Sequence, residues 1–137
     1  MADVTAVTAF KAKCATAMAA KYYYVTLHDS GGSALTTSTT TYSAGIAGEL
    51  ATNYGYTRGA KQVAATASTN NVDTADAVWT ASGGSIGPAS YAALWCGDST
   101  GDITGATLVC VKDSSATPQT ATTGNTMTAT LVNPISF

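Results

Sequence analysis

Short runs of β-forming residues alternate with turn residues through most of this sequence, and this alternation limits the folds that the chain can adopt. Glycine, asparagine and proline mark the turns between the runs. Several short strands with turn signals at this spacing favour an antiparallel sandwich or barrel, so we expect a mainly β, jelly-roll-like antiparallel β-sandwich. The runs that predict strands are Tyr22–His28, Gln62–Ser68, Asp73–Thr80, Ser90–Cys96, Thr107–Lys112 and Thr126–Val132.

The segment Val4–Ala20 has a different pattern, which predicts an N-terminal α-helix. Asp3 or Thr5 is placed to cap its first turn. An amphipathic helix of this kind either packs on its own sheet or reaches to a neighbouring molecule. The apolar residues that recur three or four positions apart are Val7, Phe10, Cys14 and Met18.

The residues between the first strand and the second lack a clear period. Asp29–Ser33 is expected to be a flexible turn, and Ala34–Tyr42 an irregular loop rich in threonine. Ala44–Ala51 is expected to form a short second helix, although its two glycines lower the helix propensity.

No linker divides the chain, so residues 1–137 are expected to form a single domain. Within it, residues 1–20 form the helix or an arm, and residues 21–137 form the sandwich. The run Gly83–Pro88 is interpreted as a turn between two strands, because no Lys-Ser or Lys-Thr pair follows it to make a phosphate loop.

Charged residues are unusually scarce in this chain. They make up 10% of the sequence, with a net charge of −2, whereas soluble domains average about 25%. A chain without a basic stripe is not expected to bind nucleic acid. Such a weakly charged surface is tolerated when much of it is covered by other subunits, so we expect ordered assembly.

The sequence contains neither an apolar run long enough to span a membrane nor a secretory signal pattern, so no membrane partner is expected. Three cysteines, Cys14, Cys96 and Cys110, are too few and too far apart for a disulfide framework or a zinc site. They are interpreted as thiols that pack as small apolar groups, with a Cys96–Cys110 bond across neighbouring strands left open.

Groups suited to catalysis are few. His28 is the single histidine, and its neighbours Asp29 and Ser30 suggest a triad only superficially, because successive residues of a strand point to opposite faces. We therefore expect His28 to be a surface or contact residue. No enzyme activity and no cofactor is expected.

Two further groups suggest ligands. The loop Asp98–Asp102 has oxygen ligands for calcium but lacks the alternating carboxylates of a calcium loop, so it is interpreted as a turn. Trp79, Tyr91 and Trp95 either stack on sugars or fill the sandwich core, and the core is the expected place.

The segment Asp76–Trp95, which reads D-A-V-W-T-A-S-G-G-S-I-G-P-A-S-Y-A-A-L-W, resembles a family of small structural proteins of tailed bacteriophages. Members carry a V-W-T-A-S-G-G-S-I stretch before a strand. The resemblance spans about residues 22–133, and it departs from the family pattern at Ser90 and at Cys96-Gly97. Its other matching blocks, in the same order as in the family, are Tyr24–His28, Gly48–Gly59 and Thr123–Ala129.

This resemblance implies a non-enzymatic virion component made in the bacterial host cytoplasm, placed on the capsid surface as a cement or decoration protein. Its expected partners are the major capsid protein and further copies of itself, as a homotrimer or homodimer. The alternative is a tail or fibre component that binds host carbohydrate through Trp79 or Trp95. The residues expected at the interfaces are Phe10, Lys11, Tyr22, Tyr24 and Trp95.

Overall fold

The computed structural model describes residues 8–36, 38–39, 41–132 and 134–137, and its largest element is a four-stranded antiparallel sheet. β1 and β7 lie at the centre of this sheet and pair over their full length, from Tyr22 opposite Gly97 to His28 opposite Tyr91. The sheet consists, in spatial order, of β2 (Gln62–Val63), β1 (Tyr22–His28), β7 (Tyr91–Gly97) and β8 (Thr107–Asp113).

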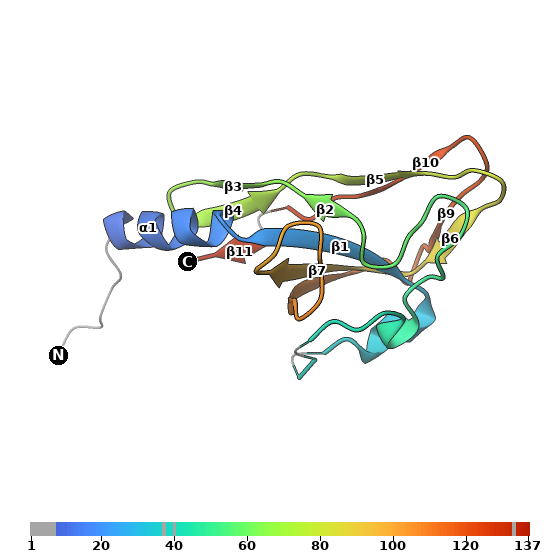
Figure 1. Ribbon diagram of the computed structural model, residues 1–137, viewed down its shortest axis with the longest axis horizontal. Helices are drawn as coiled ribbons and strands as arrows, with labels where there is room; N and C mark the ends of the chain where they lie inside the picture. Colours follow the sequence, from blue (N-terminus) through green and yellow to red (C-terminus); the bar gives the residue numbers. More distant parts are fainter. Residues whose placement is uncertain (1–7, 37, 40, 133) are drawn as a thin grey trace.

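A second layer of shorter strands covers one face of this sheet (Figure 1). Large side chains from the two layers, among them Leu94, Val72 and Trp79, meet in the main hydrophobic core. The second layer contains three small sheets: β3 (Ala65–Ala67) with β4 (Asn71–Thr74) and β11 (Ile135–Ser136), β5 (Ala77–Thr80) with β10 (Thr126–Ala129), and β6 (Ile86–Ala89) with β9 (Gln119–Ala121).

Irregular chain covers the opposite face of the four-stranded sheet. Trp95 and Tyr24 point into this second core, where the ring of Tyr42 meets that of Trp95 edge to face with centroids 5.4 Å apart. The covering chain includes two 3₁₀ turns, η1 (Ser30–Ala34) and η2 (Ile46–Gly48). Because both faces are covered, β1 is buried from Tyr23 through His28, which explains its nearly continuous apolar and aromatic sequence.

Helix α1 (Thr8–Ala19) lies at one end of the elongated molecule, close to the C-terminus, and packs on β3 and β4 (Figure 1). Ala15 is completely buried there, and Met18 lies beside it against the main core. The expected helix is therefore confirmed from Thr8 to Ala19, whereas its start at Val4, its caps and Val7 lie outside the described residues. Phe10 does not join the buried side, since 61% of it is exposed.

The expected mainly β fold with an N-terminal helix is confirmed, and the differences lie in detail. The predicted strands 62–68 and 73–80 are each divided in two, and β6, β9 and β11 were not predicted. Gly83–Pro88 is not only a turn, because β6 begins at Ile86 and continues past Pro88. The predicted second helix is reduced to η2, since Ala47 takes a left-handed conformation with φ of 48°.

The expected turn at Asp29–Ser33 is present and takes the form of η1. The carboxylate of Asp29 accepts a hydrogen bond from the Gly31 amide at 2.7 Å and caps η1. Gly32 is buried against the ring of Tyr91, where a Cβ atom would come within 2.6 Å of that ring. A close approach of the backbone to an aromatic ring thus fixes this segment on the sheet.

Candidate functional site

His28, the residue with the most catalytic potential in the sequence, lies at the end of β1 and is fully buried. Its Nδ1–H donates to the carbonyl oxygens of Ile46 and Ala47 at 3.1 and 3.2 Å. Its Nε2 lies 2.7 Å from the hydroxyl of Thr26, and that hydroxyl accepts a bond from the indole N–H of Trp95 at 2.8 Å. The side chains of β1 and β7 are therefore joined by one continuous chain of hydrogen bonds.

The partners of the imidazole fix its protonation state. Carbonyl oxygens only accept, so Nδ1 carries the proton, and the indole N–H only donates, which leaves the Thr26 hydroxyl free to donate to Nε2. Burial lowers the pKa of His28, because a charged imidazolium is poorly solvated in this core. Both ring nitrogens are occupied and no substrate can reach them. The expectation of a surface or contact histidine is wrong. His28 is a buried structural residue that is held by hydrogen bonds on both ring nitrogens.

Glu49 is a buried acidic residue, with 3% of its surface exposed. Four donors surround its carboxylate. Oε2 accepts from the Tyr42 hydroxyl at 2.8 Å and the Gly45 amide at 3.0 Å, while Oε1 accepts from the Tyr56 hydroxyl at 2.9 Å and the Gly59 amide at 3.0 Å. A buried carboxylate with both oxygens doubly bonded is a structural anchor, because all its lone pairs are directed to partners.

The anchor at Glu49 extends to the sheet and to a positive charge. The Tyr56 hydroxyl accepts the amide N–H of Leu27 at 3.0 Å, which ties the carboxylate to β1. Arg58 donates from Nε to the carbonyl of Leu50 at 3.0 Å and from Nη2 to the carbonyl of Glu49 at 3.1 Å. Burial, with the Glu49 charge adding to it, raises the pKa of Tyr56, so the phenol stays a donor at physiological pH.

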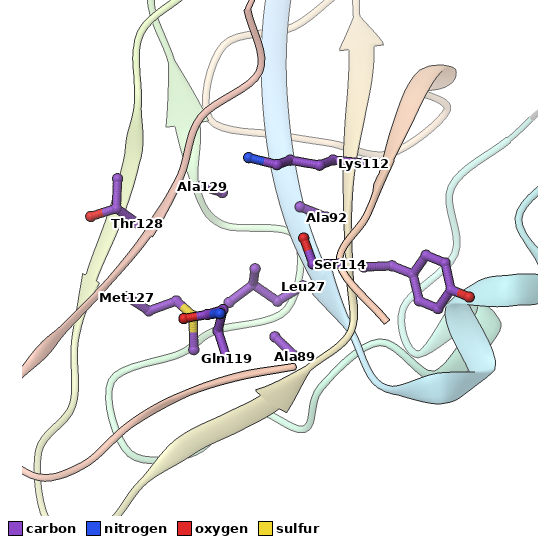
Figure 2. A pocket seen from close by; sticks show the side chains of 10 residues that line it. Leu27, Ala89, Ala92, Lys112, Ser114, Gln119, Met127, Thr128 and Ala129 are labelled. Carbon is purple, nitrogen blue, oxygen red and sulfur yellow. The ribbon is translucent and has the colours of Figure 1, made fainter. Parts of the chain in front are cut away.

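A cavity of about 210 Å³ opens at the seam between the two layers (Figure 2). Its buried lining is apolar and includes Leu27, Ala92 and Met127. Two of the polar side chains at the cavity are engaged with backbone, since Lys112 Nζ donates to the carbonyl of Thr130 at 3.1 Å and Gln119 Nε2 donates to that of Thr117 at 2.9 Å. The cavity is thus lined by apolar side chains at its base and by polar side chains around them, and no function is assigned to it.

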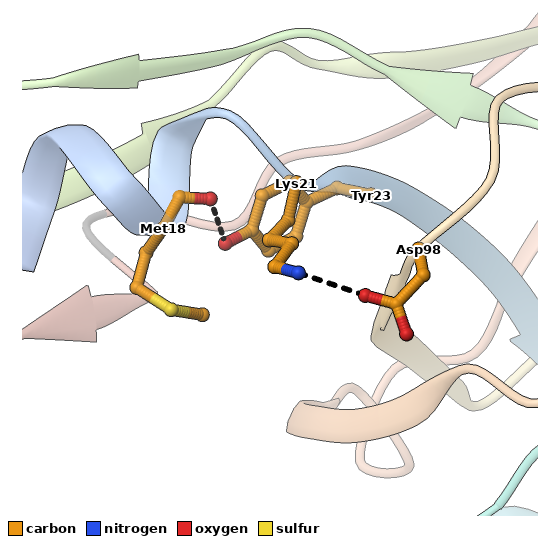
Figure 3. A network of polar contacts seen from close by, with 4 residues as sticks. All are labelled: Met18, Lys21, Tyr23 and Asp98. Atoms are coloured by element: carbon orange, nitrogen blue, oxygen red, sulfur yellow. Dashed lines mark hydrogen bonds and ion pairs between the residues drawn. The ribbon is translucent and has the colours of Figure 1, made fainter.

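Polar contacts also join the C-terminal end of α1 to the sheet (Figure 3). The Tyr23 hydroxyl donates to the carbonyl of Met18 at 2.8 Å. Lys21 forms an ion pair of 2.8 Å with Asp98, which raises the pKa of Lys21 and lowers that of Asp98. Both charged side chains are well exposed, so this pair adds little stability.

The predicted calcium-like loop is a turn within the described structure. Asp102 Oδ1 accepts from the Thr104 amide at 2.9 Å, and hydrogen bonds from the Thr104 side chain and then from its amide lower the pKa of Asp102. Among the described residues, no three histidine, cysteine or acidic side chains converge on a metal position. Cys96 and Cys110 are free thiols, because the register places Cys110 opposite Leu94 and not opposite Cys96.

The predicted interface residues fall into two groups. Tyr24 and Trp95 are 1% and 0% exposed, so their side chains pack inside the chain and offer no contact surface. Phe10 is exposed and Lys11 and Tyr22 are half-buried, and for these three the interface stays a prediction. Trp79 is 3% exposed, so the tryptophans form core, as the sequence indicated, and not a sugar-stacking platform.

The residues that organise this region were largely missed by sequence reasoning. Glu49, Tyr42, Tyr56 and Arg58 all belong to segments that lack a period. The available signal was a lone glutamate, in a stretch almost free of charge, flanked on each side by a tyrosine seven residues away. Such an acid can accept hydrogen bonds from both tyrosine hydroxyls, and these bonds allow its carboxylate to be buried.

Comparison of the chain with known protein families, with curated proteins and with solved structures finds no match. Within the described residues, no helix has the length and apolar character needed to cross a membrane.

Proposed function

We propose that this chain is a structural protein of a tailed-bacteriophage virion, made in the host cytoplasm, that binds the outside of the capsid as a cement or decoration protein. The observation that carries the proposal is the block Asp76–Trp95 with its V-W-T-A-S-G-G-S-I stretch. This block supplies β5, the turn after it, β6 and most of β7, so it contributes strands to both layers of the fold. No catalytic role is assigned to any residue.

The exposed side of α1 supports a role in contacting another protein. The exposed residues of this helix are Thr8, Ala9, Phe10, Lys13, Thr16 and Ala17, so its outer side is mixed in character, and Phe10 is the large apolar side chain on it. We therefore place the shell contact on this outer side, with Phe10 at its centre and Lys11 beside it.

The copy number in purified particles tests the proposal directly. Quantitative mass spectrometry of virions should find this chain in a fixed ratio to the major capsid protein that matches the positions of the capsid lattice. A few copies per particle would instead favour the tail or fibre alternative, and absence from particles would overturn both. The tail or fibre alternative relied on Trp79 or Trp95 to stack on host carbohydrate, and both side chains are buried.

A binding experiment tests the place of the contact. The full chain is added to shells that lack it, and Phe10→Asp is compared with Tyr54→Asp, which changes another exposed aromatic residue. Phe10→Asp should weaken binding by about tenfold or more, because an exposed anchor is replaced by a charge. Equal binding by the two variants would place the contact elsewhere. Deletion of residues 1–20 is less suitable, because Ala15 and Met18 belong to the core.

A further inference from the structure

The six basic residues of this chain differ in whether their charged groups have a partner within the molecule. A carboxylate, an aromatic ring or backbone carbonyls engage four of them, which are Lys21, Arg58, Lys61 and Lys112. Within the part of the chain that the structure describes, the side chains of the other two, Lys11 and Lys13, form neither an ion pair nor a hydrogen bond. Both of these unengaged cations lie on α1.

The two lysines lie beside the most exposed aromatic side chain among the described residues, Phe10, of which 61% is exposed. Phe10, Lys13 and Ala17 are spaced three and four positions apart, so they form one row along the helix, and all three are exposed. Lys11 follows Phe10 directly and is half-buried at the side of this row. The helix from Thr8 to Ala19 contains no acidic residue, so the charge along the row is of one sign.

The position of α1 makes this row accessible to a large partner. The helix lies at one end of the elongated molecule, and its first turns project beyond the strands on which its C-terminal half packs (Figure 1). Ala15 is its buried residue, and the three residues from Thr8 to Phe10 are all exposed. An exposed aromatic side chain with an unpaired cation on either side thus forms a compact contact surface.

The number of charges distinguishes between the kinds of partner. Proteins that bind nucleic acid through the phosphate backbone use a basic stripe with several phosphate contacts, and anionic membrane surfaces attract clusters of about four to eight basic residues. Two lysines on a chain with a net charge of −2 are too few for either. Protein interfaces, by contrast, combine an aromatic anchor in a pocket with a few charges at the rim.

We propose that the outer side of α1 binds an acidic protein surface, in which an apolar pocket takes the ring of Phe10 and carboxylates at the rim pair with Lys13 and Lys11. The unengaged cations carry this inference, because charged groups across an interface are arranged in complementary fashion. The inference rests on the proposed function, in which this side of α1 contacts the capsid shell, and it states the chemistry of the shell surface that the helix contacts.

Shell binding at two salt concentrations tests the charge of the contact. Shells of the major capsid protein that lack this chain are titrated with the full chain in about 50 mM and about 500 mM NaCl. The affinity of the wild-type chain should fall by about tenfold in the stronger salt, because salt screens the attraction between charges at the rim of an interface. An affinity that stays the same or rises would overturn the inference and leave the proposed function intact.

Charge reversal at Lys13 tests the place of the contact. Lys13→Glu should weaken shell binding by about tenfold or more in the weaker salt, whereas Lys13→Arg keeps the charge and should bind as wild type does. The matched control is Lys112→Glu, since Lys112 is exposed and lies opposite Ala92, towards the end of β7 that is far from α1. It should bind within about twofold of wild type. Equal losses for the two reversals would reflect net charge alone and would overturn the inference.

Other occupants of this side of α1 are tested with the same variant. The wild-type chain and Lys13→Glu are mixed with vesicles that contain phosphatidylserine, and each is also sedimented alone in an analytical ultracentrifuge. Vesicle binding that Lys13→Glu abolishes would overturn the inference in favour of a membrane, and a dimer that Lys13→Glu dissociates would overturn it in favour of a second copy. A wild-type chain that does not bind shells would overturn the proposed function and the inference with it.

Discussion

The hydroxyl of Tyr56 donates to Glu49 Oε1 at 2.9 Å while it accepts the backbone amide of Leu27, and so it couples a buried carboxylate to the central strand of the sheet. Residues 42–59 have little regular secondary structure of their own. The hydrogen bonds between this carboxylate and its four donors hold these residues in position on the sheet.

Replacement of Glu49 by glutamine should therefore destabilise the fold strongly. The glutamine nitrogen would face two of the four donors, so two hydrogen bonds to a charged group would be lost in a buried place. We expect a loss of about 3 kcal/mol or more in the free energy of unfolding, measured by urea denaturation. Asp76→Asn, at an exposed acid, is the control and should change the value by less than about 0.5 kcal/mol. Similar losses in both variants would contradict the anchor.

Thr26→Val should also destabilise the protein, although valine has nearly the shape of threonine. The change leaves the buried indole N–H of Trp95 and the Nε2 atom of His28 without their partner. We expect a loss of about 2 kcal/mol in the free energy of unfolding. Thr66→Val, on the exposed side of β3, should be close to neutral, and a neutral Thr26→Val would show that the hydrogen-bond chain is not important for stability.

His28 should make the stability depend on pH on the acidic side. Its pKa in the folded chain is lowered, so the unfolded chain binds a proton first, at about pH 6.5. This contribution to stability is constant above that pH and is lost as the pH falls from about 6.5 towards the folded pKa, by up to about 1.4 kcal/mol per pH unit. Denaturation curves of wild type and His28→Gln at several pH values measure it. Parallel pH profiles for the two chains would refute the assignment.

Gly55→Ala should be much more harmful than Gly101→Ala. Both glycines have a positive φ, 99° and 70°, so both substitutions strain the backbone. A Cβ atom at residue 55 would also lie 2.1 Å from the carbonyl oxygen of Thr80, whereas nothing lies within 4 Å of one at residue 101. We expect about 1 kcal/mol of destabilisation at Gly101 and clearly more at Gly55, measured by thermal unfolding. Equal shifts in melting temperature would mean that the chain near Thr80 moves aside.

The sequence predicted the parts of the fold that depend on local pattern. The strands at Tyr22–His28, Ser90–Cys96 and Thr107–Lys112 match β1, β7 and β8 closely, because each is a long run of β-forming residues. β6 was missed because Gly87 and Pro88 normally interrupt strands, and here the strand lies at an edge where the proline needs no ladder bond.

The buried polar network was beyond the reach of local pattern. Thr26 and Trp95 lie 69 residues apart in the sequence, and only the pairing of β1 with β7 brings them together. His28 was expected near the surface because it ends a strand, yet the irregular chain around Ile46 covers it. Sequence periodicity describes which face of a strand is apolar, but it does not show that a loop will cover the other face.

The covering of the sheet by residues 42–59 has a consequence for engineering this protein. Peptide insertions in this segment would separate the hydrogen-bond donors of the Glu49 carboxylate, so they should abolish expression of folded chain. The segment would otherwise be expected to tolerate insertions, because it is irregular. Turns with open surroundings, such as those at Gly105 and Gly124, have no such dependence. Display of foreign epitopes should succeed at these turns, and they are the natural places at which related chains would gain or lose residues.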